Sequence, residues 1–368
     1  MSVEAARRLV QSLDIGTKED SFGRPFLRPD YKTFPIEARN FRQIKTVNKK
    51  GRISFIDGGN QEILHAPNFS VQINRVYFNI FEDNVRKNPR NLPARIEFFS
   101  ATYSDFENDD LFFKTVIYPL NEKYRVYMPD EKDLCFSSCD RTMMIGLQRA
   151  DISRVASVAR RFAEWKFASH IIEEELEEKN VLVVDGTLQA PYTNEPKYVE
   201  RIQRFAEQKG VYFTGLSKSC ELYTTTGLSL IGAIKKLAIN NNLSGVWYYP
   251  VASISSIDHK AIVLIVKLHS NAERIFRFEV FSKEPDIENE IPEEAIAWLS
   301  ENSRDTSFPG YPYGLIDADA FARVRNDEVE RYRLILLSEI SKQGKWEKFA
   351  RHIQASDAHS VLNMLVGD

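Results

Sequence analysis

Hydrophobic and polar residues follow a strand-like pattern in the first half of this chain. Segments rich in Val, Ile, Tyr and Phe are separated by short polar connections, which is typical of consecutive β-strands. Because each segment follows the last so closely, we expect an antiparallel meander. The predicted strands are residues 52–57, 69–81, 94–103 and 111–118, with a short addition at 124–128.

A helical pattern follows, and then helices and strands alternate. Apolar residues spaced by three and four predict a long helix over 152–179. Four aliphatic residues at 181–184 predict a strand that is covered on both faces. Further strands are expected at 211–216, 246–254, 261–268 and 274–281, and helices at 2–14, 197–209, 228–240, 292–303, 314–323, 326–342, 344–353 and 357–366.

This order of elements predicts one continuous α/β domain over residues 1–368. Its core is a mixed sheet flanked by helices over about residues 50–325, and helices are added at the N-terminus and over about 326–368. A hydrophobic content of 43% and a charged content of 27% are ordinary for a soluble globular protein. No apolar run is long enough to span a bilayer, and the amphipathic N-terminus lacks the apolar core of a signal peptide.

The three cysteines, Cys135, Cys139 and Cys220, form neither a disulfide framework nor a zinc ribbon. We therefore expect free thiols, a cytoplasmic location and no membrane partner. The net charge of −3 gives no overall attraction to nucleic acid. A local patch of six cations is either a solvated loop or an arm that contacts phosphates, and it consists of Arg39, Arg42, Lys45, Lys49, Lys50 and Arg52.

Two hydrophobic strands each end in an Asp-Gly pair, at Asp57-Gly58 and Asp185-Gly186. Asp-Gly is a common turn dipeptide, so each pair is also consistent with a simple strand end. If the two strands are neighbours, however, their aspartates lie close together. Paired carboxylates supply the oxygen ligands that Mg²⁺ and Mn²⁺ take at sites of phosphoryl transfer.

Other chemistries lack their sequence patterns. The chain has no Gly-x-Ser-x-Gly of a serine hydrolase. It has no phosphate-binding loop of the Gly-x-x-x-x-Gly-Lys type, so we expect no ATP hydrolysis by the chain alone. The six histidines show no zinc-ligand spacing, and His259 is expected to be structural.

The order of short motifs resembles the NurA family of DNA end-resection nucleases. These motifs are the two Asp-Gly strands, Gly215-Leu216-Ser217-Lys218, Phe276-Arg277-Phe278-Glu279, and Gly310-Tyr311-Pro312 before a helix. The resemblance runs from about residue 52 to about 324. It implies an RNase H-like core, two Mn²⁺ or Mg²⁺ ions, a homodimer, and a hexameric HerA-type ATPase as partner. It also implies 5′-to-3′ exonuclease activity on DNA ends, with possible endonuclease activity on single strands.

The resemblance also implies six site residues. Asp57 and Asp185 match the family's metal ligands, and Glu164 matches its helical glutamate, with Glu173 and Glu174 as rivals. Lys218 matches a lysine that can neutralise charge on the phosphate, although it can equally be a surface lysine. Tyr311 matches the tyrosine of Gly-Tyr-Pro, or is a packing aromatic residue.

The sequence departs from the family at Asp319, where a histidine is expected. Aspartate binds hard cations directly, so Asp57, Glu164, Asp185 and Asp319 together remain a candidate metal-ligand set. Histidine's change of charge near neutral pH would be lost. The alternative function is therefore a catalytically reduced member that binds DNA or the ATPase as an adaptor. The residues alone do not separate DNA from RNA as the substrate.

Overall fold

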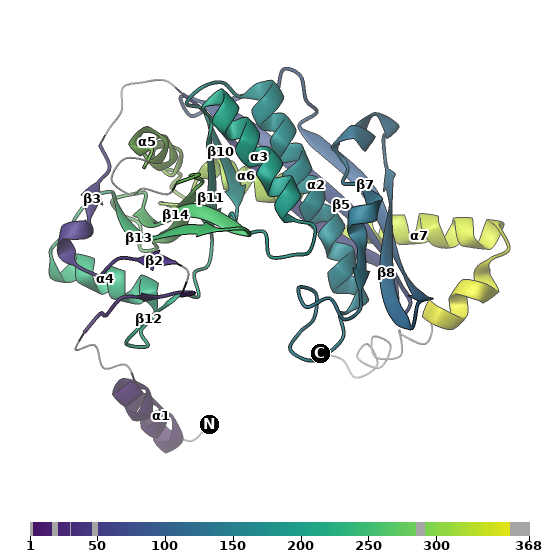
Figure 1. The fold of residues 1–368 in the computed structure, drawn as a ribbon, viewed down its shortest axis with the longest axis horizontal. Coiled ribbons are helices and arrows are strands. Elements are labelled where there is room, and N and C mark those ends of the chain that lie inside the picture. Colours follow the sequence, from purple (N-terminus) through teal and green to yellow (C-terminus); the bar gives the residue numbers. More distant parts are fainter. Residues whose placement is uncertain (1–2, 17–20, 30, 46–50, 285–290, 354–368) are drawn as a thin grey trace. The chain divides into compact units, whose positions relative to one another are not determined.

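The computed structural model describes residues 3–16, 21–29, 31–45, 51–284 and 291–353 (Figure 1). Two compact units are distinguished by their backbone contacts. The first unit consists of Met1–Lys49, Asp185–Gln189 and Thr214–Pro312. The second consists of Lys50–Val184, Ala190–Phe213 and Tyr313–Asp368.

The predicted meander forms the main sheet of the second unit. Strands β4 (Arg52–Ala66), β5 (Phe69–Glu82), β7 (Arg95–Glu107) and β8 (Asp110–Pro119) pair antiparallel in chain order, which confirms the prediction. Two short strands add to this sheet, β6 (Val85–Lys87) on β5 and β9 (Cys135–Ser137) on β8. On its other side β4 pairs in parallel with β10 (Val181–Asp185), so the sheet is mixed. The long strands β5, β7 and β8 are drawn in blue in Figure 1.

Two details of the predicted strands are wrong. Strand β4 does not end at Asp57-Gly58, because its pairing with β5 continues as far as Ala66 opposite Phe69. Residues 124–128 do not form a strand. Residues up to Tyr127 belong to the 3-10 helix η2 (Glu122–Tyr127), whose start is capped by the Asn121 side chain, and a second such helix, η3 (Glu131–Leu134), follows.

Helix α2 (Ile152–Glu175) packs against β4, β5 and β7, and Figure 1 shows it beside β5 and β7. Its N-cap is Asp151, whose side chain accepts from two backbone N–H groups. It ends before the predicted residue 179, at Glu175, whose buried carboxylate accepts three backbone N–H groups from residues 90–92. The apolar residues that predicted this helix are buried, as expected, and they are Val155, Val158, Phe162, Trp165, Ile172 and Leu176.

The second unit also contains the helices α3 (Pro196–Lys209), α6 (Tyr313–Ala322) and α7 (Asn326–Lys342). Helix α3 packs on α2 and ends, as predicted, at Lys209, and Gly210 follows in the left-handed conformation. Helix α6 packs on β4 and β5. Tyr332 and Leu336 of α7 pack on a small core around Ile63 and Ile73, whereas Leu334 and Ile335 are exposed.

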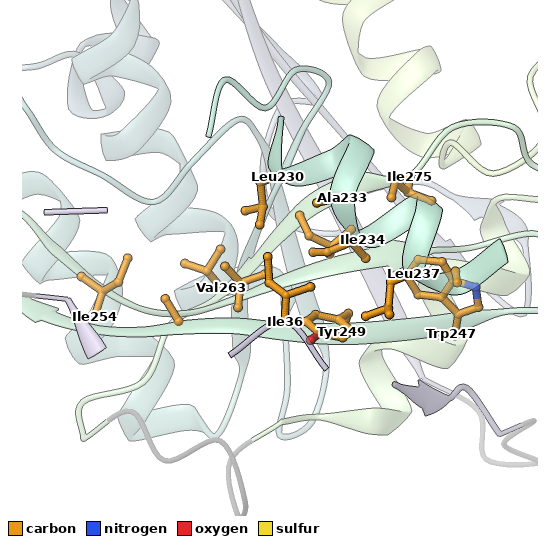
Figure 2. Packing of buried hydrophobic residues seen from close by; sticks show 14 residues of the cluster. Ile36, Leu230, Ala233, Ile234, Leu237, Trp247, Tyr249, Ile254, Val263 and Ile275 are labelled. Carbon is orange, nitrogen blue, oxygen red and sulfur yellow. The ribbon is translucent and has the colours of Figure 1, made fainter. Parts of the chain in front are cut away.

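The first unit is built on an antiparallel sheet of β13 (Trp247–Ser256), β14 (His259–Lys267) and β15 (Phe276–Val280), with β11 (Tyr212–Ser217) on β15. Its other elements are α1 (Val3–Gly16), α4 (Leu230–Asn240), α5 (Glu293–Asn302), η1 (Ala38–Asn40), β1 (Pro25–Phe26), β2 (Lys32–Thr33), β3 (Arg42–Gln43) and β12 (Tyr223–Thr224). Figure 2 shows its core, in which Leu230 and Ile234 of α4 lie over Tyr249 and Val263 of the sheet.

The expected α/β fold, with a mixed sheet, flanking helices and helical additions at both ends, is confirmed. Residues 346–353 are helical, close to the prediction, and the helix predicted at 357–366 lies outside the described residues. The three cysteines are free thiols, as predicted. Among the described residues, no helix has the length and apolar character needed to cross a membrane.

Candidate active site

Strand pairing holds Asp57 and Asp185 side by side. The parallel strands β4 and β10 run in register, with Val184 opposite Ile56. The next residue on each strand is an aspartate, so the two carboxylates leave the sheet at the same level. The repeated Asp-Gly pattern predicted this arrangement, because neighbouring parallel strands end at the same edge of a sheet.

Helix α6 brings a third carboxylate to the same place. Ligand oxygens of Asp57, Asp185 and Asp319 all lie within 4.8 Å of one another, and all three residues are partly buried. Asp57 and Asp319 lie close together because α6 covers the face of β4 that carries Asp57. A Cβ built on Gly59 would lie 2.4 Å from the Ala322 carbonyl at the end of α6. Since alternate residues of a strand share a face, Asp57 also lies on the face that α6 covers.

A buried polar contact fixes α6 on the sheet. Asp317 is 7% exposed and accepts a hydrogen bond of 2.8 Å from Asn79 Nδ2 of β5. Arg86 pairs with the same carboxylate at 3.1 Å. Burial, together with the charge of Asp317, raises the pKa of the Tyr77 hydroxyl to about 12. Asp317 was not among the site residues predicted from the sequence, although it lies only two residues before Asp319.

Glu164 approaches β4 from the opposite face. A Cβ built on Gly58 would lie 2.9 Å from Glu164 Oε2, so this carboxylate of α2 packs on the bare backbone next to Asp57. Glu164 is 6% exposed, pairs with Arg160 one turn earlier at 2.5 Å, and is not one of the three grouped carboxylates. The rivals Glu173 and Glu174 are exposed and lie roughly 14 Å further along the helix axis.

Lys218 contacts the cluster directly. Its Nζ lies 2.6 Å from Asp185 Oδ2, and the lysine side chain is 46% exposed whereas the aspartate side chain is 13% exposed. Lys218 immediately follows β11. The structure therefore places this cation against a carboxylate of the cluster while leaving much of its side chain open to solvent.

The segment after Asp185 is held by two hydrogen bonds. Gly186 N–H donates to the Leu216 carbonyl at 2.9 Å, and Leu188 N–H donates to Glu279 Oε2 at 2.8 Å. Glu279 is fully buried and also meets His259 Nε2 at 2.8 Å. Burial by itself raises the pKa of the Glu279 carboxyl, but the neighbouring Arg277 and His259 lower it to about 2. Glu279 thus remains an ionised anchor for this segment.

Tyr311 is placed in an aromatic cluster of the first unit. It is 4% exposed, and its ring centroid lies 5.2 Å from that of Phe276 and 6.0 Å from that of Phe308. These edge-to-face contacts are those of a packing aromatic residue. A catalytic role for Tyr311 stays a prediction.

Two arginines near the carboxylates were not assigned to the site from the sequence. Arg323 Nη2 lies 2.7 Å from Asp319 Oδ2, and Arg160 pairs with Glu164. Each lies four residues from its acidic partner on a helix, a spacing that could have revealed both pairs. The donor set of the cluster consists of carboxylate oxygens only, which fits a hard divalent cation such as Mg²⁺ or Mn²⁺.

Comparisons with known proteins identify the family and the fold of the chain. The NurA domain, as a family model, matches residues 51–324. The NurA nuclease from Sulfolobus solfataricus has a similar fold, with 14% sequence identity, a TM-score of 0.50, and coverage of 94% of this chain and 99% of that chain. Endonuclease V of Ciona intestinalis, bound to a DNA with an inosine followed by a ribo-adenosine, gives 10% identity, a TM-score of 0.37, and coverage of 81% and 93%.

No curated protein matches the sequence. The NurA domain nevertheless covers most of the chain, including all six predicted site residues. The chain therefore belongs to the NurA family of nucleases.

Proposed function

We propose that this chain is a metal-dependent nuclease that hydrolyses phosphodiester bonds at the cluster of Asp57, Asp185 and Asp319. The observation that carries the proposal is the meeting of these carboxylates from β4, β10 and α6 within 4.8 Å. Separate elements hold them on a packed scaffold, which is how a catalytic constellation is kept in a fixed geometry.

In the proposed site the three aspartates would hold Mn²⁺ or Mg²⁺. When bound there, a pair of such ions would supply activation of a water and stabilisation of the leaving oxygen. Asp185 has a second role, because its contact with Lys218 holds the ammonium group beside the cluster. Lys218 is then positioned to neutralise charge that develops on the phosphate. The exposed part of its side chain allows it to move from the carboxylate to the substrate.

Glu164 is proposed to support the site from the α2 face of β4. It packs against Gly58, so it limits the movement of the backbone that carries Asp57. To bind a metal ion directly, the Glu164 carboxylate would have to reach around β4 from the α2 face to the α6 face. Tyr311 is proposed to support the Gly-Tyr-Pro turn before α6 by its aromatic packing.

Membership of the family supports the finer parts of the proposal. We propose DNA as the substrate, with single strands and duplex ends both accepted, and 5′-to-3′ exonuclease activity in the resection of double-strand breaks. We also propose a homodimer in the cytoplasm, a single nuclease domain, and a hexameric HerA-type ATPase as the motor. The sequence lacks a phosphate-binding loop of its own, which agrees with a separate motor.

A second candidate function is a DNA- or ATPase-binding adaptor with reduced catalysis. It is favoured by Asp319, which stands where the family has histidine and which pairs with Arg323 at 2.7 Å. That ion pair has to open, or share its carboxylate, before Asp319 can bind a cation.

A cleavage assay with the pure chain separates the two functions. Single-stranded DNA, duplex DNA and RNA of one sequence are incubated with Mn²⁺, with Mg²⁺ or with EDTA, beside Asp185→Ala. The nuclease proposal expects DNA cleavage that needs the cation and is lost in the variant. Binding of DNA without cleavage under every condition would favour the adaptor. Labels at either end of the DNA report the direction of digestion.

A further inference from the structure

A pocket in the first unit lies next to Lys218. It has a volume of about 320 Å³. Its walls come from the end of β11 and the following turn, from the start of α4, and from residues 273–277 at and before β15. Lys218 is one of the lining residues and also contacts Asp185, so the pocket adjoins the proposed catalytic lysine.

The lining of this pocket is predominantly cationic. Lys218, Lys235, Arg274 and Arg277 contribute four positive charges, and Glu273 contributes one negative charge. Lys235 donates from Nζ to the Glu273 carbonyl at 2.7 Å, which holds it across the pocket. Two of the cations also meet acids outside the lining, Lys218 with Asp185 and Arg277 with Glu279. Lys235 and Arg274 are both exposed and therefore available to an anion.

Helix α4 adds a positive end to the same pocket. Ser229 is its N-cap, and both Ser229 and Ile231 line the pocket. The backbone N–H groups and the dipole of a helix N-terminus favour an anion. The helix is firmly placed, because Leu230, Ala233 and Ile234 are buried against the sheet, as Figure 2 shows.

An unsatisfied buried hydroxyl points independently to a ligand. Ser217 lines the pocket and is 7% exposed. Within the part of the chain that the structure describes, Ser217 Oγ has no hydrogen-bond partner. A buried hydroxyl without a partner is destabilising, so a serine at this position suits a ligand group that accepts a hydrogen bond. The Nε of Arg277, a second lining residue, also lacks a partner there.

We propose that this pocket binds a phosphate group of the nucleic-acid substrate, next to the phosphate that is cut. The cations, the N-terminus of α4 and the free hydroxyl of Ser217 all favour a compact oxyanion. The inference rests on the proposed function, because a nucleic acid supplies the phosphate. Binding at this pocket sets which bond reaches the aspartate cluster. The bound group is an internal backbone phosphate or the phosphate of a 5′ end, and the two are distinguished below.

The test measures DNA binding by the full chain in EDTA, where cleavage does not interfere. Fluorescence anisotropy compares wild type with Lys235→Gln, using short single-stranded DNA with either a 5′-phosphate or a 5′-hydroxyl. The matched control is Lys236→Gln, the neighbouring lysine on α4, which does not line the pocket. Arg274→Gln is the second test variant, and circular dichroism checks that each variant is folded.

We expect Lys235→Gln and Arg274→Gln each to weaken DNA binding about tenfold. Each should also reduce, by about one, the steepness with which the logarithm of the affinity falls with the logarithm of the salt concentration. Loss with both oligonucleotides identifies an internal phosphate, and loss only with the phosphorylated one identifies a 5′ end. Affinities equal to the Lys236→Gln control, or no binding by wild type, would overturn the proposal. If the two variants show the expected losses of binding but the wild type cuts no DNA with Mn²⁺, only the proposed function would be rejected.

Ser217→Ala gives a result that a purely structural serine would not give. Removing an unsatisfied buried hydroxyl leaves stability unchanged or raises it, whereas removing a phosphate ligand weakens DNA binding. We expect an unchanged or higher thermal midpoint together with a severalfold loss of affinity. A variant that binds DNA as tightly as wild type would exclude Ser217 from the site.

Discussion

The backbone of Gly314 lies directly against the ring of Phe55. A Cβ built on this glycine would be 2.0 Å from Phe55 Cδ2. The contact joins the first turn of α6 to β4, two residues before Asp57. Close packing of the helix on the strand therefore brings Asp319 to the aspartate cluster, and only glycine permits that approach.

Replacing this glycine should displace the helix. Gly314→Ala is expected to lower the free energy of unfolding by about 1–3 kcal/mol, because the added methyl group overpacks the contact with Phe55. It should also weaken Mn²⁺ binding, because Asp319 moves with α6. Chemical denaturation and a metal titration measure the two effects.

Two further variants control this prediction. Gly232→Ala lies in α4, where an added Cβ meets nothing closer than 3.7 Å, and it should be neutral or stabilising by up to about 1 kcal/mol. Phe55→Leu should relieve part of the clash in the Gly314→Ala background. If Gly314→Ala proved as stable as Gly232→Ala, the close contact between α6 and β4 would be wrong.

Acid should destabilise the folded chain by protonating Glu279, whose carboxylate holds the segment after Asp185. The pKa of this carboxyl is about 2 in the folded chain against an ordinary 4.5. Because the folded pKa is the lower one, its stabilising effect is complete above pH 4.5 and is lost as the pH falls towards 2. We therefore expect the stability of the folded chain to fall over this pH range.

Comparison with Glu279→Gln isolates this contribution from that of other acids. Urea unfolding at several pH values between 7 and 2 should show wild type losing more stability than the variant. The variant itself should be less stable at pH 7, because it leaves the partly buried Arg277 without its anionic partner. Parallel pH curves for the two proteins would show that Glu279 is not the ionised anchor.

Asp319 stands where the resemblance to the family predicts a histidine. If it acts as a metal ligand, Asp319→Ala should reduce metal-dependent cleavage by about a hundredfold or more. Asp319→His should retain part of the activity and introduce a dependence on pH near 6.5, the ordinary pKa of histidine. Rates measured from pH 5.5 to 8 test both expectations. Equal rates in all three proteins would remove Asp319 from the site.

Repeated motifs and periodic patterns in the sequence predicted several features of the structure correctly. The Asp-Gly repeat predicted that Asp57 and Asp185 meet, and the meander and the buried stripe of α2 were predicted from their periodicity. The continuation of β4 beyond Asp57 was missed, because an Asp-Gly pair permits a turn without requiring one. Pairing with β5 decides this point, and pairing is not a local property.

The position of Glu164 shows a second limit. Its apolar neighbours predicted a helix, yet no local pattern says which face of β4 that helix covers. Two adjacent glycines of β4 show which helix covers each face. A Cβ on Gly58 would contact α2, and a Cβ on Gly59 would contact α6. The proposed phosphate pocket could not be predicted from local patterns either, because Ser217, Lys235 and Arg274 belong to distant segments that only the fold brings together.

The central claim is that carboxylates from β4, β10 and α6 together hold a divalent cation. Titration calorimetry with Mn²⁺ tests it most directly, with wild type, the double variant Asp57→Asn/Asp185→Asn, and Asp109→Asn as a control. Asp109 is an exposed residue in the left-handed region at the β7–β8 turn, where asparagine is well tolerated. We expect wild type and Asp109→Asn to bind Mn²⁺ alike, and the double variant to lose Mn²⁺ binding while it remains folded. Equal Mn²⁺ binding by all three proteins would contradict it.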